Sequence, residues 1–407
     1  MTDTPTQPTP APDLILEGGH VIDPANGRDG VLDVGIAGGR VVAVGPDLPA
    51  PAGARVLDVA GRYVTPGIID PHAHVCVTHP RSGLSLDPRV NTFSSGVTTV
   101  VDAGTAGWLD LADFVERVIA TAKIRVLTFV NIVGAGMGGE WEHEAAEMRP
   151  ALAADVARAF GDVVVGIKTA HYWARRPFDA AHRPWTAVDR ALEAGALAGK
   201  PVMVDFFPAP ERPYSELILD KLRPGDIHTH VFAQQFPILD DAGRVNDFMF
   251  RARERGVIFD LGHGAASFWF RLAAPAIRQG FVPDSISTDL HTGNLNGPVI
   301  DMQTTMNKVL AMGVPLPEVI ARSTVAPARW LGHPELGTLT VGAEADVAVF
   351  ALDEGAFPLV DCGHATLTGS RRLRCVLTLR AGEVVYNPHG LGLPYWEEAP
   401  AEYWTLR

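Results

Sequence analysis

The sequence predicts an α/β fold: a TIM-like (β/α)8 barrel with a small β-sandwich domain built from both ends of the chain. Apolar, strand-like runs recur eight times through the middle of the chain, and helical patterns lie between several of them. Both ends instead carry short β-rich runs broken by glycine turns. The 407 residues are long enough for one barrel of about 250 residues and an appended domain.

The eight predicted barrel strands are continuous apolar runs, as expected of parallel strands that are buried on both faces. They occupy residues 68–69, 98–101, 126–130, 163–167, 202–204, 226–231, 257–259 and 285–288. Helical periodicity is found at residues 109–122, 150–160, 185–198, 246–255 and 268–279. A barrel of this kind places its active site at the carboxyl ends of its strands.

The two ends of the chain are predicted to form one discontinuous domain. Residues 13–64 and 335–390 share short strand-like runs with turn signals such as Gly38-Gly39 and Ala381-Gly382. We therefore expect a β domain from these two segments and a barrel of residues 65–334. Residues 1–12, rich in Thr and Pro, are predicted to be a flexible tail, and residues 391–407 a C-terminal extension.

Composition limits the partners and the location. A formal net charge of -13 argues against a nucleic-acid partner, because binding to phosphates needs a basic excess. Three widely spaced cysteines form no disulfide framework, which predicts a reducing, cytoplasmic location. The chain has no run of about 18 apolar residues, so no membrane span is expected. A small-molecule substrate remains the predicted partner.

The chemistry is predicted from the strand ends. His72 and His74 follow the first strand, and alternate side chains of a strand point the same way, so the two imidazoles can bind one metal ion. Such a pair alone is a weak signal. Further polar residues end the later strands, namely Lys168, Asp205, His230, His263 and Asp289 on strands four to eight. Polar groups at so many strand ends predict a metal site at the mouth of the barrel.

On these residues the chain resembles the amidohydrolase superfamily over nearly its whole length. The resemblance is carried by Asp-x-His-x-His at residues 70–74 and by the Asp that ends strand eight. Gly-Ile-Lys (166–168), Asp-Leu-Gly-His-Gly (260–264) and Ser-Ile-Ser-Thr-Asp (285–289) are similar to the deacetylase and dihydroorotase-like subgroup.

The resemblance implies a centre of two divalent metal ions, usually zinc. His72, His74 and Asp289 would hold one ion, and Lys168, carboxylated by carbon dioxide, would bridge both. His230 would bind the second ion. The family normally supplies a histidine where this chain has Asp205, so Asp205 is either a ligand that favours a harder ion such as Mn²⁺, or the mark of a weak or empty second site.

The implied reaction is hydrolysis of an amide or ester, most narrowly a deacetylation, by attack of metal-bound hydroxide. Asp289 would act as the general base and then as the general acid. The residues expected to contact the substrate are His171, Tyr172, His263 and His291. His171 and His228 are also weighed as substitute metal ligands, but we prefer a substrate-facing role for His171 and a barrel-layer role for His228.

Three alternative functions stay open. The barrel could be a cyclic amidohydrolase of the dihydroorotase kind, or a deaminase with one metal ion, although Lys168 counts against the deaminase. It could also be a non-catalytic barrel, an alternative that remains because Asp205 stands where the family normally has a metal-binding histidine. Homo-oligomers are common among such barrels, so one is expected by analogy only.

Overall fold

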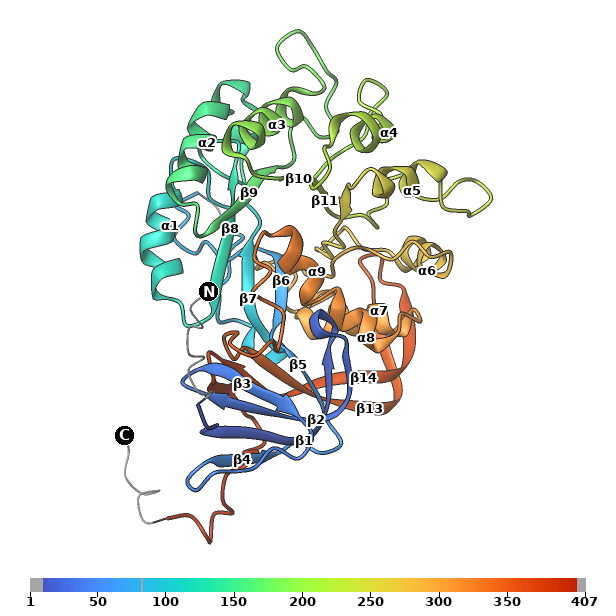
Figure 1. Ribbon diagram of the computed structural model, residues 1–407. Coiled ribbons are helices and arrows are strands. Elements are labelled where there is room, and N and C mark those ends of the chain that lie inside the picture. The colour runs from blue at the N-terminus through green and yellow to red at the C-terminus, as the bar shows by residue number, and fades with distance from the viewer. Residues whose placement is uncertain (1–9, 82, 401–407) are drawn as a thin grey trace, which may run out of the picture.

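The computed structural model describes residues 10–81 and 83–400. Most of the predicted tail, residues 1–9, and residues 401–407 of the predicted extension lie outside the described residues. Figure 1 shows a barrel whose outer helices surround its strands, with a second sheet below it that combines the blue N-terminal strands with the red C-terminal ones. The predicted fold class is confirmed.

Seven parallel strands form the barrel sheet, and neighbours in the sheet are also neighbours along the chain. Each strand coincides with one of the predicted apolar runs. In order they are β6 (Ile68–Ala73), β7 (Val97–Asp102), β8 (Arg125–Asn131), β9 (Val164–Thr169), β10 (Val202–Val204), β11 (Ile227–His228) and β12 (Ile258–Phe259).

The predicted eighth strand closes the barrel through isolated bridges. Ser285 bridges Asp260, just after β12, and Leu290 bridges Ala73, at the end of β6. The nitrogen of Asp289 also donates to the carbonyl of His72 at 2.6 Å. Residues 285–290 therefore lie between the seventh and first strands, which brings Asp289 beside the first-strand histidines.

Helices cover the outside of the barrel. The predicted helices are found as α1 (Leu111–Arg117), α2 (Pro150–Ala159), α3 (Thr186–Ala198), α5 (Asp247–Glu254) and α6 (Phe270–Arg278). Our prediction did not include α4 (Tyr214–Glu216), α7 (Met302–Ala311), α8 (Leu316–Ala321) and α9 (Val325–Trp330). Short 3₁₀ turns lie at Pro24–Asn26, Phe93–Ser95, Ile119–Thr121, Glu140–His143 and Ala145–Glu147, and a π-helical turn at Leu217–Lys221. No helix in the described part of the chain is long and apolar enough to cross a membrane.

A buried cluster fills the barrel below the site. Each of the first six strands contributes, and α9 with the residues after it completes the cluster: Ile69, Val101, Leu127, Phe129, Val165, Met203, Ile227, Ala328, Leu331 and Leu336. The interior is thus a packed core rather than a pore, so the polar strand ends are confined to one face.

The second sheet joins both chain ends in the order β15-β14-β13-β5-β1-β2-β3, with β4 paired to β1. Its antiparallel β13–β5 pairing links the two segments. The bounds are β1 (Leu14–Asp23), β2 (Arg28–Ala37), β3 (Arg40–Gly45), β4 (Arg55–Asp58), β5 (Tyr63–Pro66), β13 (Val347–Val360), β14 (Thr366–Arg380) and β15 (Glu383–Tyr386).

The β13–β14 hairpin reaches well beyond this sheet, along the barrel (Figure 1). At its tip, the Asp361 carboxylate accepts a hydrogen bond from the nitrogen of Phe270 at 2.9 Å, and the nitrogen of Cys362 donates to the carbonyl of Phe268 at 3.1 Å. The tip therefore packs against the loop that follows strand seven, which carries His263.

Candidate metal centre

A cavity of about 200 Å³ lies where the carboxyl ends of the barrel strands meet. Most of the predicted site residues line it, together with two apolar side chains: His72, His74, Leu84, Met137, Lys168, His171, Asp205, His230, Asp289 and His291. The structure thus brings the strand-end residues predicted to bind metal to one small space.

His72, His74 and Asp289 form the tightest group in the cavity. One potential ligand atom from each lies within 4.8 Å of the others. The Oδ1 atom of Asp289 is 2.9 Å from Nε2 of His74 and 3.5 Å from Nε2 of His72. Burial alone would raise the pKa of Asp289, but the contact with His74 and the other neighbouring histidines hold it well below its ordinary value. The carboxylate is therefore ionised, as a metal ligand requires.

Hydrogen bonds at Nδ1 fix how His72 presents its ring. Nδ1 lies 2.9 Å from the Thr229 hydroxyl and 3.3 Å from an oxygen of Asp260. Because the hydroxyl of Thr229 donates to Asp260, Nδ1 of His72 must be the donor, and Nε2 keeps its lone pair for the cavity. Burial and the charge of Lys168 lower the pKa of His72 to about 3, so the ring is neutral.

His74 is held in the same manner. Its Nδ1 lies 2.7 Å from the hydroxyl of Thr105, which donates onward to Asp102 at 2.9 Å. Nδ1 therefore carries the proton, and Nε2 faces the cavity with a free lone pair. Histidines that bind metal commonly have this arrangement, in which the outer nitrogen donates to a fixed acceptor.

Two buried groups in the cavity have no hydrogen-bond partner: Nζ of Lys168 and Nε2 of His72. A buried polar atom without a partner is costly, so such atoms call for a bound group. Burial also lowers the pKa of Lys168, which favours the neutral amine. Two imidazole nitrogens, a carboxylate and a buried lysine amine fit a divalent cation.

His230 and Asp205 lie on the other side of the cavity. Nδ1 of His230 donates to the carbonyl of Gly262 at 2.7 Å, and its Nε2 lies 3.9 Å from Oδ2 of Asp205. Burial would raise the pKa of Asp205, but the charges of His230, His171 and Lys168 hold it below its ordinary value. Within the described ranges, no second group of three histidine, cysteine or carboxylate residues is as tight as the first. The potential ligand atoms on this side of the cavity therefore lie farther apart.

His171 reaches the cavity from the loop after β9. Its Nδ1 lies 3.1 Å from Oε2 of Glu142, and its Nε2 lies 3.4 Å from Oδ2 of Asp205. Burial would lower the pKa of His171, but the hydrogen bond and charge of Glu142, with the charge of Asp205, raise it to about 9. His171 thus joins two carboxylates at the cavity wall.

His291 also lines the cavity but carries its proton on the other nitrogen. Its Nδ1 accepts a hydrogen bond from the nitrogen of Gly293 at 3.0 Å. The neutral ring therefore has its proton on Nε2, which makes it a hydrogen-bond donor rather than a metal ligand there.

Tyr172, His263 and His228 are not among the residues that line the cavity. His263 is buried, stacks on Phe268, and its Nε2 accepts a hydrogen bond from Nζ of Lys308 at 2.7 Å. His228 packs against the rings of Tyr214, Phe236 and Phe259, which belong to a different cluster from the one that fills the barrel. Substrate binding by Tyr172 and His263 stays a prediction.

The sequence reasoning missed the residues that orient the imidazoles, namely Asp102, Thr105, Glu142, Thr229 and Asp260. Asp102 and Asp260 could have been noticed, because each directly follows or ends a predicted strand. Glu142 stands in a loop without periodicity and carried no signal.

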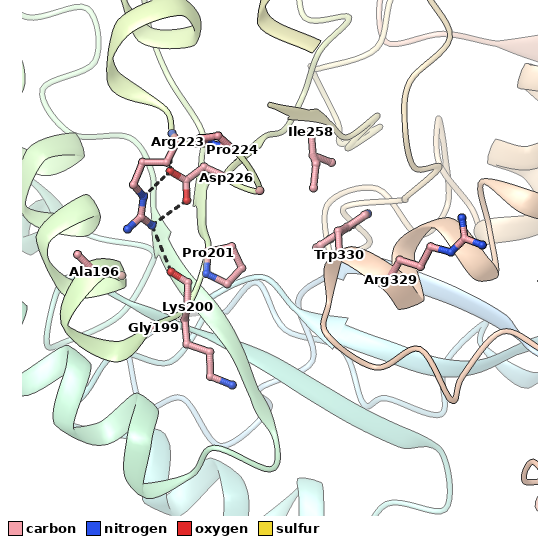
Figure 2. Close-up of a pocket in the computed structure, with 12 residues that line it drawn as sticks. Ala196, Gly199, Lys200, Pro201, Arg223, Pro224, Asp226, Ile258, Arg329 and Trp330 are labelled. Atoms are coloured by element: carbon pink, nitrogen blue, oxygen red, sulfur yellow. Dashed lines mark hydrogen bonds and ion pairs between the residues drawn. The ribbon is translucent and has the colours of Figure 1, made fainter. Parts of the chain in front are cut away.

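A larger cavity, of about 540 Å³, lies at the opposite, amino-terminal ends of the strands (Figure 2). Its closest polar groups bind one another, whereas Nε1 of Trp330 has no hydrogen-bond partner. Arg223 contacts both carboxylate oxygens of Asp226 at 2.9 Å and donates to the carbonyl of Lys200 at 3.2 Å. Because barrel active sites lie at the other end of the strands, and because the larger cavity has, among the described residues, no group of potential metal ligands, the smaller cavity is the candidate site.

Comparisons with known proteins agree with this geometry. No family model matches the chain. A protein named deacetylase from Enterococcus faecalis is 31% identical over 389 residues, which cover 92% of this chain and 99% of the relative. Deacetylase Atu3266 from Agrobacterium fabrum is 33% identical over 340 residues, or 81% of this chain and 80% of the relative.

Two solved structures share the whole architecture. The crystal structure of an adenine deaminase superposes with a TM-score of 0.83 at 30% identity, and covers 92% of this chain and all of that chain (100%). The crystal structure of a dihydroorotase gives a TM-score of 0.79 at 27% identity, and covers 92% of this chain and 99% of that chain. Because deacetylase relatives match at over 30% identity through most of their length, and the barrel carries its polar cluster at the strand ends, the chain belongs to the amidohydrolase superfamily of metal-dependent hydrolases.

Proposed function

We propose that the protein hydrolyses an amide or ester bond of a small acyl compound, with deacetylation as the narrower reaction. The observation that carries this proposal is the convergence of His72, His74 and Asp289 beside the unpartnered amine of Lys168. Relatives named deacetylase support the narrower reaction. A cavity of about 200 Å³ with Leu84 and Met137 in its wall suits a small acyl group better than a long one.

His72, His74 and Asp289 would hold one divalent cation, zinc or manganese, and His230 with Asp205 would contribute to a second. Such a cation polarises a carbonyl group and lowers the pKa of water. Lys168, carboxylated by carbon dioxide, would offer two oxygens between the two halves of the cavity. The lowered pKa of Lys168 supports this, because only a neutral amine reacts with carbon dioxide.

Asp289 would move the proton. Its ionised carboxylate would accept a proton from the attacking water and then give it to the leaving nitrogen or oxygen, so one group serves as base and acid. His291 would donate a hydrogen bond from Nε2 to the acyl oxygen, where negative charge develops. The protein's own residues thus divide proton transfer and charge stabilisation between two side chains.

Two related reactions have specific support. A similar solved dihydroorotase favours ring opening of a cyclic amide, and a similar solved adenine deaminase favours attack on an amino-substituted ring carbon. Both use water as the nucleophile and differ in the leaving group. We also propose a cytoplasmic location, on the sparse cysteines, and a homo-oligomer, by analogy.

The test combines metal analysis with a substrate panel. Metal-free protein is reconstituted with Zn²⁺ or Mn²⁺ in the presence of bicarbonate, and bound metal is measured by mass spectrometry. Reconstituted protein is then assayed on N-acetyl amino acids, acetyl esters, cyclic amides and adenine. Hydrolysis of acetyl compounds that is lost in Asp289→Asn supports the proposal. If only adenine or cyclic amides are hydrolysed, the proposed acyl substrate is wrong and one of the related reactions takes its place. If no substrate is hydrolysed in a metal-dependent way, the proposed hydrolase function is refuted.

A further inference from the structure

We propose that His171 is a ligand of the second cation in this centre and that Glu142 is the residue that positions it. The loop histidine supplies the nitrogen donor that Asp205, at the end of β10, does not. This inference rests on the proposed function, because it concerns the same metal centre. It changes the role predicted for His171, from a substrate contact to a part of the metal site.

The hydrogen-bond pattern of the cavity histidines is the first argument. His72, His74, His230 and His171 each contact a neighbouring oxygen through Nδ1 and turn Nε2 towards the cavity. Ligating histidines in metalloproteins typically have this form. His291 shows the contrast within the same cavity, because its Nδ1 accepts a hydrogen bond from the nitrogen of Gly293 instead of facing an oxygen. In the orientation of its ring, His171 therefore matches the ligands.

The spacing of donor atoms is the second argument. Oδ2 of Asp205 lies 3.4 Å from Nε2 of His171 and 3.9 Å from Nε2 of His230. With metal–ligand distances of about 2.0–2.2 Å, two donors on one ion are at most about 4.2 Å apart. Both separations meet this limit, so Asp205 can share a cation with either imidazole. His230 and Asp205 alone offer one nitrogen. Among the described residues, His171, Asp205 and His230 do not form a group with all ligand atoms within 4.8 Å, so the two imidazole nitrogens must move closer together when both bind one ion.

Glu142 holds His171 in place. It is almost fully buried, and its Oε1 accepts hydrogen bonds from the nitrogens of Gly138 at 2.5 Å and Gly139 at 3.2 Å. Its other oxygen, Oε2, contacts Nδ1 of His171. His171 has a backbone φ of 57°, a left-handed conformation that residues other than glycine rarely adopt. A fixed carboxylate that holds a strained histidine at the cavity edge is typical of a functional position.

The test counts metal ions and uses matched variants. Metal-free wild type, His171→Asn and Glu142→Gln are reconstituted with Zn²⁺ and bicarbonate, and stoichiometry and affinity are measured by mass spectrometry and calorimetry. His143→Asn is the control, because His143 lies beside Glu142 and contacts the nitrogen of Trp173 but does not line the cavity. We expect two ions in the wild type and the control. His171→Asn should retain one ion, and Glu142→Gln should bind the second about 10–100-fold more weakly.

Two further measurements separate ligation from a structural role. The visible spectrum of the Co²⁺-substituted protein should change in His171→Asn and not in His143→Asn. Adding Asp205→His to His171→Asn should restore the second ion. Two ions at wild-type affinity in His171→Asn, or one ion in the wild type, would overturn this inference and leave the hydrolase standing. A wild type that binds no metal would end both proposals.

Discussion

Thr288 donates two hydrogen bonds to the carboxylate of Asp70, from its backbone nitrogen at 3.1 Å and from its hydroxyl at 2.5 Å. Asp70 precedes His72 by two residues on the first strand, and Thr288 directly precedes Asp289 on the eighth. Both are buried. The contact that closes the barrel therefore also sets the distance between the first-strand histidines and the proposed general base.

Replacing Asp70 with Ala should destabilise the fold and the site together. The change leaves the buried N–H of Thr288 without an acceptor and leaves its hydroxyl with only the longer hydrogen bond to the carbonyl of His72 at 3.3 Å, which we expect to cost about 1–3 kcal/mol. Urea unfolding of metal-free protein measures this cost. Thr288→Val, which removes only the hydroxyl, should cost about 1 kcal/mol. If Asp70→Ala unfolds at the same urea concentration as the wild type, the contact between Asp70 and Thr288 contributes little to the stability of the fold.

Gly264→Ala should damage the metal site more than the fold. A Cβ at Gly264 would lie 2.6 Å from Oδ2 of Asp289, and its φ is +57°. Gly280 offers a control, with φ of +85° and nothing within 4 Å of its Cβ position. Both changes should cost about 1 kcal/mol of stability through backbone strain. Only Gly264→Ala should weaken Zn²⁺ binding by tenfold or more, and equal Zn²⁺ affinities in the two variants would contradict this.

Thr105→Val should weaken metal binding through His74. The change removes the hydroxyl that accepts the Nδ1 proton of His74, so the ring loses its fixed orientation. We expect a 10–100-fold loss of Zn²⁺ affinity by calorimetry. Thr128→Val is the control, because Thr128 is buried but its hydroxyl donates to the carbonyl of Phe129. An unchanged affinity in Thr105→Val would show that the ring needs no such anchor.

Lys308 should make stability depend on alkaline pH. Burial lowers the pKa of Lys308 from 10.5 to about 8. Between these values the unfolded chain binds more protons than the folded one, so the free energy of unfolding contributed by Lys308 rises with pH. From pH 7.5 to 10, metal-free wild type should gain about 2 kcal/mol relative to Lys308→Met in urea unfolding. Parallel pH curves for the two proteins would rule this out.

The fold and the main cluster could be predicted because their signals are local. Buried strands are continuous apolar runs, and the parallel barrel topology then places the last residues of each strand at one mouth. The meeting of His72 with Asp289 follows from closure of that barrel. The contact that orients His171 could not be predicted, since Glu142 meets His171 across two segments that have no periodicity.

His263 shows where strand-based reasoning stops. It ends the seventh predicted strand, but it stands between Gly262 and Gly264, which have φ of +49° and +57°. The left-handed backbone breaks the alternation of side chains, so His263 points to Lys308 on α7 instead of the cavity. The glycines on both sides of His263 are the sequence feature that could have indicated this change of direction.

The hairpin tip at Asp361 and Cys362 has a consequence for the order of folding. It supports the loop after strand seven, yet the Sγ of Cys362 contacts the carbonyl of Gly264 across 98 residues of sequence. Contacts of such separation form late, because loop closure must come first. During synthesis the barrel can assemble its strands before this support exists. The loop beside Asp289 therefore gains its support only after the hairpin tip, which is synthesised well after the barrel strands, has left the ribosome.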